Sequence, residues 1–282
     1  MKKLVYSLFI IAFSASNLLA QDDGDKKVKL GITITPAVNW LTPGNDKKLT
    51  NNGSVVKMGI GLAADFRLTD IIWFNTGIEY TGAGGKLGYK ASDTAEYYYK
   101  DDAIQEVKAT DAGTWNSSAN TDAKMKRYDL VARNYKVGYI HIPLGFKLKT
   151  KELGGITYYG QIGGDLFIKT SAKGDDDVQD VTPTLSAPNG TYAASTISGN
   201  KLGGVVNFMN GAAHVGAGME YRISGSTAIM ASIQYRHGIM NFTNSGTDFL
   251  LHRVKDNTGT NYTQFANDTK LRQIVLTVGI MF

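Results

Sequence analysis

Residues 56–80 read VKMGIGLAADFRLTDIIWFNTGIEY. On both sides of Thr69-Asp70, large apolar side chains occupy every second position and alternate with small or charged ones. A period of two places alternate side chains on opposite faces of a β-strand, and a short polar link between two such runs is typical of a hairpin turn. This stretch therefore predicts two antiparallel strands, each with one apolar and one polar face.

The same alternation recurs along the chain and predicts eight strands, over residues 28–35, 56–68, 72–81, 140–149, 156–169, 214–223, 229–236 and 273–282. The links alternate between short turns and four long polar segments, at 41–54, 83–136, 170–210 and 241–269. Short turns at one end and long loops at the other are typical of an outer-membrane barrel. We therefore predict an all-β fold: an eight-stranded antiparallel transmembrane β-barrel over residues 21–282, with short periplasmic turns, four long extracellular loops and both termini periplasmic.

The polar face decides which side of the predicted barrel meets solvent or lipid. It carries many small residues, among them Gly59, Gly61 and Gly145, which suit a narrow, filled lumen better than a surface in water. A soluble barrel of the lipocalin kind, with its apolar face inside, is the alternative fold. Aromatic residues near the strand ends predict two girdles at the membrane interfaces: Phe66, Phe74, Tyr80, Phe146, Tyr158, Tyr221, Tyr235 and Phe282, with Trp40 and Tyr139 also near the loop ends.

Charged residues also lie on the polar face, and single buried charges are costly. We therefore expect a paired network that fills the lumen, which in an eight-stranded barrel has room for little more than side chains. Its predicted members are Lys57, Asp65, Arg67, Glu79, Lys147, Asp165, Glu220, Arg222 and Arg236. A polar path for a small solute is the alternative function of the same residues.

Residues 1–20 have the features of a cleaved signal peptide. Lys2 and Lys3 precede an apolar core from Leu4 to Ala15, and Ala20 provides a small residue before the expected cleavage site. The apolar run is too short to span a bilayer as a helix. The chain has no cysteine, so a lipoprotein is excluded, and we expect export to the outer membrane of a Gram-negative cell.

Composition excludes several other classes of protein. With no cysteine, the chain is neither a disulfide-stapled domain, a zinc ribbon nor a cysteine-dependent enzyme. The formal net charge is +5, and Lys2 and Lys3 supply two of these charges, so nucleic acid is not an expected partner. The expected partners are outer-membrane lipid and, during insertion, the barrel-assembly machinery, and the chain is expected to be a monomer.

Two segments resemble known proteins. Residues 139–147, YIHIPLGFK, resemble the Y-[LI]-x-[IV]-P-[LI]-x-x-K signature of Bacteroidetes outer-membrane β-barrel proteins of the PorT-like family. The ending from Leu276 to Phe282 resembles the terminal strand of outer-membrane proteins, which the barrel-assembly machinery reads. The resemblance implies an outer-membrane location and suggests a link to protein secretion, but it does not imply one activity.

We expect no cofactor, no metal site and no enzymatic activity. The acidic run Asp175-Asp176-Asp177 with Asp180 lacks the spacing of a calcium loop. A barrel enzyme acting on lipid A or peptides is the less favoured alternative, with His214, Ser232 and Glu220 as its candidate set.

Tyrosines in the second long link are candidates for recognition, because tyrosine gives large contact area at low entropic cost. They are Tyr97, Tyr98 and Tyr99, joined by Trp115. The alternative is that these rings extend a girdle or pack loop on loop. The expected function is a structural or surface-interaction role through the long loops.

Overall fold

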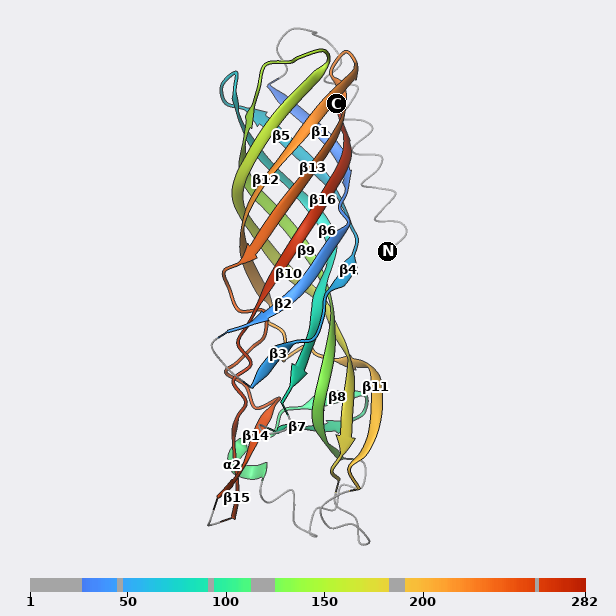
Figure 1. The fold of residues 1–282 in the computed structure, drawn as a ribbon, viewed down its shortest axis with the longest axis vertical. Coiled ribbons are helices and arrows are strands. Elements are labelled where there is room, and N and C mark those ends of the chain that lie inside the picture. Colours follow the sequence, from blue (N-terminus) through green and yellow to red (C-terminus); the bar gives the residue numbers. More distant parts are fainter. Residues whose placement is uncertain (1–26, 45–47, 91–93, 113–124, 183–190, 257–258) are drawn as a thin grey trace.

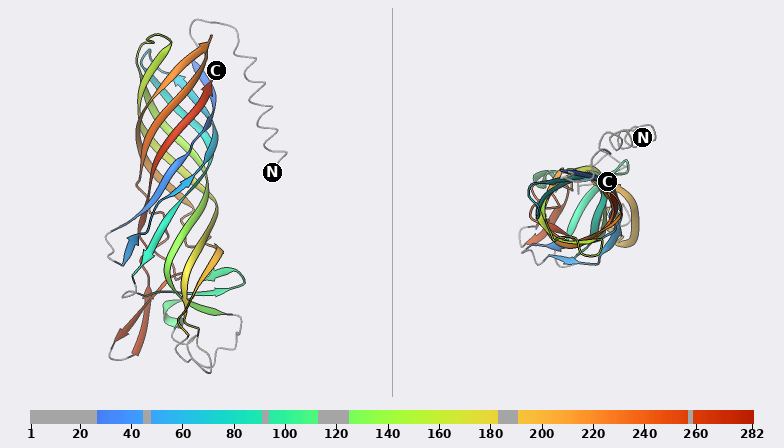
Figure 2. Two further views of the ribbon diagram at one scale, coloured as in Figure 1. Left: turned by 45° about the vertical axis from the view of Figure 1, so that its right-hand side comes forward. Right: turned by 90° about the horizontal axis from the view of Figure 1, so that it is seen from above.

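The computed structural model describes residues 27–44, 48–90, 94–112, 125–182, 191–256 and 259–282. The predicted signal peptide and Trp115 lie outside these residues. The described strands form one sheet, antiparallel except for a single parallel pairing between Ala103 and Lys201, that curves into an elongated barrel with an irregular group of strands at one end (Figure 1). Seen along its axis, the barrel is a closed ring (Figure 2). The predicted all-β barrel is confirmed.

The ring is closed by backbone pairing. Strand β1 (Val28–Ile34) pairs with β5 (Gly59–Arg67) on one side and with β16 (Thr269–Met281) on the other. Between β5 and β16 the circuit runs through adjacent antiparallel partners. These are β6 (Ile72–Tyr89), β9 (Lys126–Lys149), β10 (Ile156–Asp180), β12 (Met209–Ser224) and β13 (Thr227–Gly238). No strand of this circuit therefore has a free edge along its barrel portion, which is the condition for β-structure in lipid.

The structure assigns sixteen strands to the described residues, where the sequence predicts eight. Part of the difference arises because predicted strands are interrupted. Pro36, which has no N–H to donate, separates β1 from β2 (Ala37–Pro43), and both of these strands pair with β16. Similarly, Met58 separates β4 (Val55–Lys57) from β5. The rest of the difference lies in the predicted loops, which contain β3 (Leu49–Asn51), β7 (Ala95–Lys100), β8 (Ala103–Gln105), β11 (Ala193–Lys201), β14 (Leu251–Asp256) and β15 (Gly259–Gln264).

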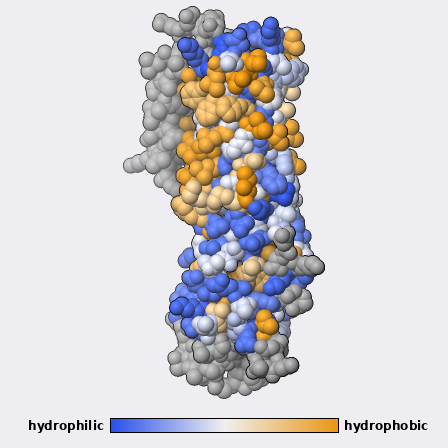
Figure 3. Space-filling view, turned by 90° about the vertical axis from the view of Figure 1, so that its left-hand side faces the viewer, coloured by the Kyte–Doolittle hydropathy of each residue, from blue (hydrophilic) through white to orange (hydrophobic). Residues whose placement is uncertain are grey.

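The apolar face of the barrel strands points outward. Ile60, Ile162, Val215 and Ile233 are each more than half exposed, while Asp65 at the inner face is fully buried. On the face shown in Figure 3, apolar residues gather around the half of the molecule that holds the turns, and polar residues dominate the half that holds the predicted loops. An apolar surface of this extent is not that of a soluble monomer, so the lipocalin-like alternative is wrong.

Three strands continue past the apolar band. Strands β9 and β10 remain paired from Lys149 and Tyr159 to Tyr128 and Asp180, with register shifts near Ser171 and Val178. Strand β6 follows β9 as far as Gly88. Together with β7, β8, β11, β14 and β15 these extensions build a folded unit, here called the cap. The sequence predicts loops here because apolar and polar residues do not alternate cleanly along the extensions.

The single described helix, α2 (Ala109–Ala112), has four residues and belongs to the cap. Among the described residues, no helix has the length and apolarity needed to cross a membrane.

Candidate functional site

The turn-side half of the lumen holds a cluster of ion pairs. Asp65 is fully buried, and Lys147 donates to both of its carboxylate oxygens, at 3.0 and 2.8 Å. Lys149 connects Asp65 to Glu220, with its Nζ 3.4 Å from Asp65 Oδ2 and 2.5 Å from Glu220 Oε1. Lys29 contacts Glu220 at 3.3 Å. Each of these two carboxylates therefore meets two ammonium groups, which offsets the cost of burying them.

Aromatic rings enclose the ammonium groups of this cluster. Lys149 Nζ lies 4.3 Å from the ring centre of Trp73, and Lys147 Nζ lies 5.0 Å from that of Tyr159. A cation over a ring face is attracted by the ring quadrupole. The rings thus stabilise the charges and also occupy the space through which a solute would pass.

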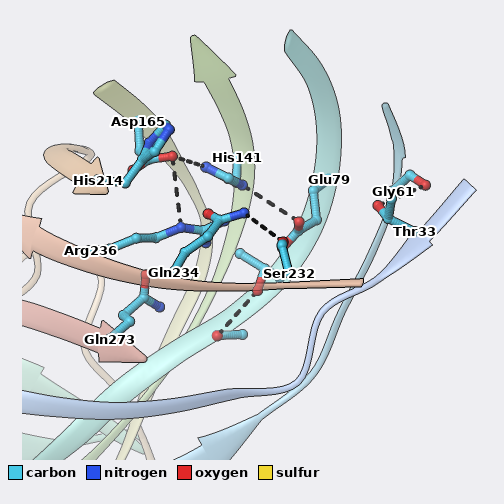
Figure 4. A network of polar contacts seen from close by, with 12 residues as sticks. Thr33, Gly61, Glu79, His141, Asp165, His214, Ser232, Gln234, Arg236 and Gln273 are labelled. Atoms are coloured by element: carbon cyan, nitrogen blue, oxygen red, sulfur yellow. Dashed lines mark hydrogen bonds and ion pairs between the residues drawn. The ribbon is translucent and has the colours of Figure 1, made fainter. Parts of the chain in front are cut away.

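A second polar group surrounds Asp165 in the lumen (Figure 4). Asp165 accepts from two imidazoles, at 2.8 Å from His141 Nε2 and 2.9 Å from His214 Nδ1. An ionised carboxylate only accepts hydrogen bonds, so both of these ring nitrogens carry a proton. Arg236 Nε is 3.8 Å from Asp165, and Glu79 is 3.7 Å from His141 Nδ1. Strands β6, β9, β10, β12 and β13 are joined across the lumen by this group.

Two glycines make room for the His214 ring. A Cβ on Gly163 would lie 2.8 Å from His214 Cε1 and 2.5 Å from Gly145 Cα, and a Cβ on Gly145 would lie 3.0 Å from His214 Nε2. The small residues on the polar face therefore leave room for a side chain from the adjacent strand β12.

A small cavity adjoins this group. Its volume is about 40 Å³ and its lining includes Thr35, Glu79, His141 and Arg236. Thr35 Oγ1, Glu79 Oε1 and Arg236 Nε are buried without a protein hydrogen-bond partner among the described residues. A polar cavity of this size has room for about three water molecules and none for a metabolite.

On the cap side, aromatic side chains close the lumen. The Phe167 ring stacks on His141 with centroids 4.5 Å apart, and Tyr139 packs edge-on against Phe167 at 5.7 Å. Leu41 and Phe242 belong to the same buried cluster. The polar lumen is thus separated from the cap by an apolar layer.

The cap has a buried ion pair at its centre. Arg133 on β9 binds Asp176 on β10 through two parallel hydrogen bonds, at 2.6 and 2.7 Å. Tyr97 on β7 donates to Asp176 at 3.0 Å, and Asn200 on β11 donates to it at 2.7 Å. The guanidinium also lies over the rings of Tyr97 and Tyr135. Two of the predicted loops are therefore joined at a single carboxylate.

A second ionic group brings in a third predicted loop. Glu96 on β7 is fully buried between Arg127 on β9, at 3.3 Å, and Arg253 on β14, at 3.1 Å. Arg253 also donates to Asp129 at 3.0 Å. Burial raises the pKa of Glu96 to about 7 despite the two guanidinium groups, and burial also raises the pKa of Asp129. Protonation of this group is therefore coupled to folding of the cap.

Comparison with known proteins identifies the family. The family model described as "Outer membrane protein beta-barrel domain" matches residues 20–244, well over half of the chain. The chain belongs to this outer-membrane β-barrel family. Membership places it in the cell outer membrane, in contact with membrane lipid, as the sequence predicts.

Several solved outer-membrane barrels resemble this family member weakly. Neisserial surface protein A is 10% identical, with a TM-score of 0.38, and the match covers 92% of this chain and 97% of that one. The attachment invasion locus protein Ail of Yersinia pestis is 12% identical, with a TM-score of 0.31 over 91% and 100% of the two chains. The protease OmpT of Escherichia coli is 10% identical, with a TM-score of 0.32 over 90% and 96%. These likenesses are too weak to support a conclusion, and no curated protein matches the chain.

Six predicted members of the lumen network lie together inside this outer-membrane β-barrel, in the two groups described above. They are Asp65, Glu79, Lys147, Asp165, Glu220 and Arg236. Alternation along each strand places them all on the inner face.

Three other predicted members do not join the network. Arg67 pairs with the exposed Asp70 at 2.8 Å, and Arg222 is 58% exposed and pairs with Glu152 at 2.6 Å. Both lie at the turn end, where a long side chain reaches water. Lys57 is half-buried near Gly82, towards the cap, and no described ion pair includes it. Alternation specifies the face of a residue but not its depth, so the predictions for Arg67, Arg222 and Lys57 are wrong.

The predicted girdle residues lie on the outer face of the outer-membrane β-barrel. Six are exposed, whereas Phe74 and Tyr235 are half-buried. Phe66, Phe74 and Phe146 form a row, with ring centroids 6.3 and 5.8 Å apart. Tyr139 is an exception: it is fully buried, because it has the same parity as His141 and points into the barrel.

The loop tyrosines are not free for recognition. Tyr97 and Tyr98 are 1% and 3% exposed, and Tyr98 donates to the backbone oxygen of Ala112 at 3.1 Å. Tyr99 is half-buried and packs on Tyr128 at 6.0 Å. The alternative of loop packing on loop is therefore correct for Tyr97 and Tyr98, which are core residues of the cap.

Several functional side chains escaped the sequence prediction. Lys149 and Lys29 lie on the predicted inner face, and their parity with Lys147 and Asp65 is the signal that identifies them. The cap residues Arg133 and Asp176 come from segments without a clean period, so no sequence signal pairs them.

The candidate enzyme set is not brought together in the outer-membrane β-barrel. His214 binds Asp165, whereas Glu220 binds Lys149. Two carboxylates of the acidic run pair with cations: Asp175 with Lys136 and Asp176 with Arg133. No cluster of potential metal ligands occurs among the described residues.

Proposed function

We propose that the chain is a closed, monomeric outer-membrane barrel whose cap is a rigid surface for interaction outside the cell. The eight strands of the closed circuit cross the membrane, the turns and both termini face the periplasm, and the cap faces outward. The observation that carries this proposal is the union of three predicted loops by the buried pairs at Asp176 and Glu96. Buried ion pairs are costly to assemble but define one arrangement of the chain segments.

The filled lumen supports an interaction role over a channel. Ion pairs with their aromatic neighbours occupy the turn side, and Tyr139 and Phe167 close the cap side. The cavity between them is about 40 Å³. We therefore propose that the barrel conducts no solute, and a steady open current of the purified protein in a planar bilayer would contradict this part.

We also propose that the chain is not an enzyme. In support, His214 and Glu220 serve separate ion-pair groups, and both are buried. A substrate of lipid or peptide size has no described route to them.

On the basis of the PorT-like resemblance, we further propose a role in protein secretion. Tyr139, Pro143 and Lys147 of that signature share the inner face of β9, where Tyr139 belongs to the apolar layer and Lys147 binds Asp65. The signature residues thus pack the lumen of the barrel. We therefore propose that contacts with a secretion partner are made by the cap.

A strain comparison tests the proposal. Residues 95–112 are replaced by a short Gly-Ser linker, and the strain is compared with wild type, with the null strain and with a matched turn-end variant, Arg222→Gln. Fractionation and the heat-dependent gel shift report whether the barrel forms in the outer membrane. We expect the variant that lacks residues 95–112 to remain in the outer membrane. We expect its strain to match the null strain in surface adhesion or in protein secretion.

Wild-type levels of adhesion and secretion in the strain that lacks residues 95–112 would show that this part of the cap is not the interaction surface. Recovery of the wild-type chain outside the outer membrane would contradict the barrel itself.

A further inference from the structure

A group of basic and aromatic side chains lies on the outer face of the barrel next to the cap. We call Trp40, Tyr235, His237, Lys270 and Arg272 the rim patch. Backbone pairing sets Arg272 on β16 directly between Trp40 on β2 and His237 on β13. On the turn side of the patch, Val38 and Ile274 pair with each other and are exposed apolar residues. The patch therefore lies at the cap-side edge of the apolar band.

The cations of the rim patch are held by neutral groups. Arg272 Nη1 donates to Tyr235 Oη at 2.9 Å and is 3.0 Å from His237 Nδ1, and the Trp40 ring lies 6.4 Å from that of Tyr235. Lys270 donates to the backbone oxygen of Ile239.

No ion pair of Arg272 or Lys270 is found among the described residues. Asp268, which directly precedes β16 and is two residues from Lys270, instead accepts a hydrogen bond from Asn241 at 2.9 Å. The patch thus presents two cations that form no ion pair with the residues that the structure describes.

The position of these cations indicates what neutralises them. A basic side chain on the lipid face of a barrel is costly at the bilayer centre and is tolerated only near the headgroups. Tyrosine and tryptophan prefer the same level. Lys270 and Arg272 are two residues apart on one face, about 7 Å along the strand, which matches a headgroup carrying more than one anionic oxygen cluster.

We infer that the rim patch binds the phosphorylated headgroup of an outer-leaflet glycolipid, with Arg272 and Lys270 on phosphate and the acyl chains along Val38 and Ile274. This inference rests on the proposed function for the orientation of the barrel, because the cap side then faces the leaflet that contains glycolipid. Trp40 and Tyr235 flank the sugar at the headgroup level.

Binding to the folded protein in detergent micelles tests the inference. The probes are lipid A with two phosphates, the same lipid A after dephosphorylation, phosphatidylglycerol and inorganic phosphate, with dissociation constants measured by native mass spectrometry. The variants are Arg272→Gln with Lys270→Gln, and as the matched control Arg222→Gln with Lys151→Gln at the turn end. The heat-dependent gel shift confirms that each variant has folded.

We expect phosphorylated lipid A to bind the wild-type protein and the control equally. Each basic side chain near an anionic surface contributes about fivefold in affinity, so the rim double variant is expected to bind roughly 25-fold more weakly. Dephosphorylated lipid A is expected to bind weakly to all forms, and millimolar phosphate is not expected to displace the lipid.

Equal affinity of the rim variant and the control would overturn the inference and leave the proposed function intact. Full displacement by free phosphate would overturn the lipid as ligand. If the wild-type protein binds phosphatidylglycerol but not lipid A, and the rim double variant loses this binding, the glycolipid is not the ligand. That result would also contradict the proposed orientation of the barrel. Failure of the wild-type protein to show the gel shift would instead contradict the barrel.

Discussion

Phe167 stacks on His141, with ring centroids 4.5 Å apart and planes inclined by 17°. His141 belongs to the polar group of the lumen, and Phe167 belongs to the apolar layer beneath the cap. The contact between these two rings is therefore the boundary at which the polar interior of the barrel ends.

Chemical access to the lumen should depend on Phe167. The chain has no cysteine, so Ser232→Cys introduces a single thiol at a position that is 4% exposed. We expect a water-soluble maleimide to label it roughly a hundredfold more slowly than the exposed Ser224→Cys, because access requires local opening. Adding Phe167→Ala is expected to raise the rate about tenfold, whereas Phe74→Ala on the outer face should not. Equal rates with and without Phe167 would show that this ring is not the barrier.

Removing the charge of Asp65 should destabilise the barrel strongly. Asp65→Asn leaves Lys147 and Lys149 buried beside a neutral group, and breaking such a pair costs about 3–5 kcal/mol. Asp70→Asn is the matched control: Asp70 is 91% exposed in its pair with Arg67, and loss of a surface pair costs at most about 1 kcal/mol. Urea unfolding in lipid vesicles, followed by tryptophan fluorescence, gives both free energies. Similar losses for the two variants would contradict the ionic plug.

Two glycines on the same strand should respond differently to a methyl group. Gly163→Ala would place a Cβ 2.5 Å from Gly145 Cα and 2.8 Å from the His214 ring, and overpacking of this kind costs about 1–3 kcal/mol. Gly160→Ala meets nothing within 4 Å, so its effect should stay within about 0.5 kcal/mol. The same unfolding measurement compares them. A neutral Gly163→Ala would mean that the His214 ring does not pack against Gly163 and Gly145.

Stability of the cap should decrease with rising pH. The pKa of Glu96 is raised by burial from 4.5 to about 7, so the folded cap binds the proton more tightly than the unfolded chain. The stabilisation is complete below pH 4.5 and is lost as the pH rises to 7, with a total of about 3 kcal/mol. Hydrogen exchange of the β7 amides at several pH values measures the opening free energy.

A matched pair of variants assigns that pH dependence. Glu96→Gln should reduce the slope, leaving a smaller part from Asp129, whose pKa is also raised by burial. Glu106→Gln, at an exposed position of the cap, should keep the wild-type slope. A slope that is the same in both variants would exclude Glu96 as its source.

Strand alternation was enough to predict the barrel and the orientation of its faces. Asp65 and Lys147 are inward by parity, and they are bonded to each other across β5 and β9. Arg67 has the same parity as Asp65 but lies two residues closer to the turn, where it binds Asp70. Depth depends on where each strand enters the membrane and on its tilt, which a period of two does not contain.

The cap could not be predicted because its contacts are between distant segments. Tyr97 and Asp176 are in different predicted loops, and their hydrogen bond depends on the register of β7, β9 and β10. A local pattern of three tyrosines therefore suggested a surface, although two of them are buried.

The continuous β9–β10 ladder also has a mechanical consequence. Its hydrogen bonds lie across the strands, from Tyr159 near the turn to Asp180 in the cap. A tether that pulls the cap along the barrel axis loads the backbones of β9 and β10 lengthwise, because both strands run from the cap into the barrel wall. The hydrogen bonds to their neighbours β6 and β12 then resist in shear, many at once. Tension on the cap is thus passed to the embedded wall before the cap itself can unravel.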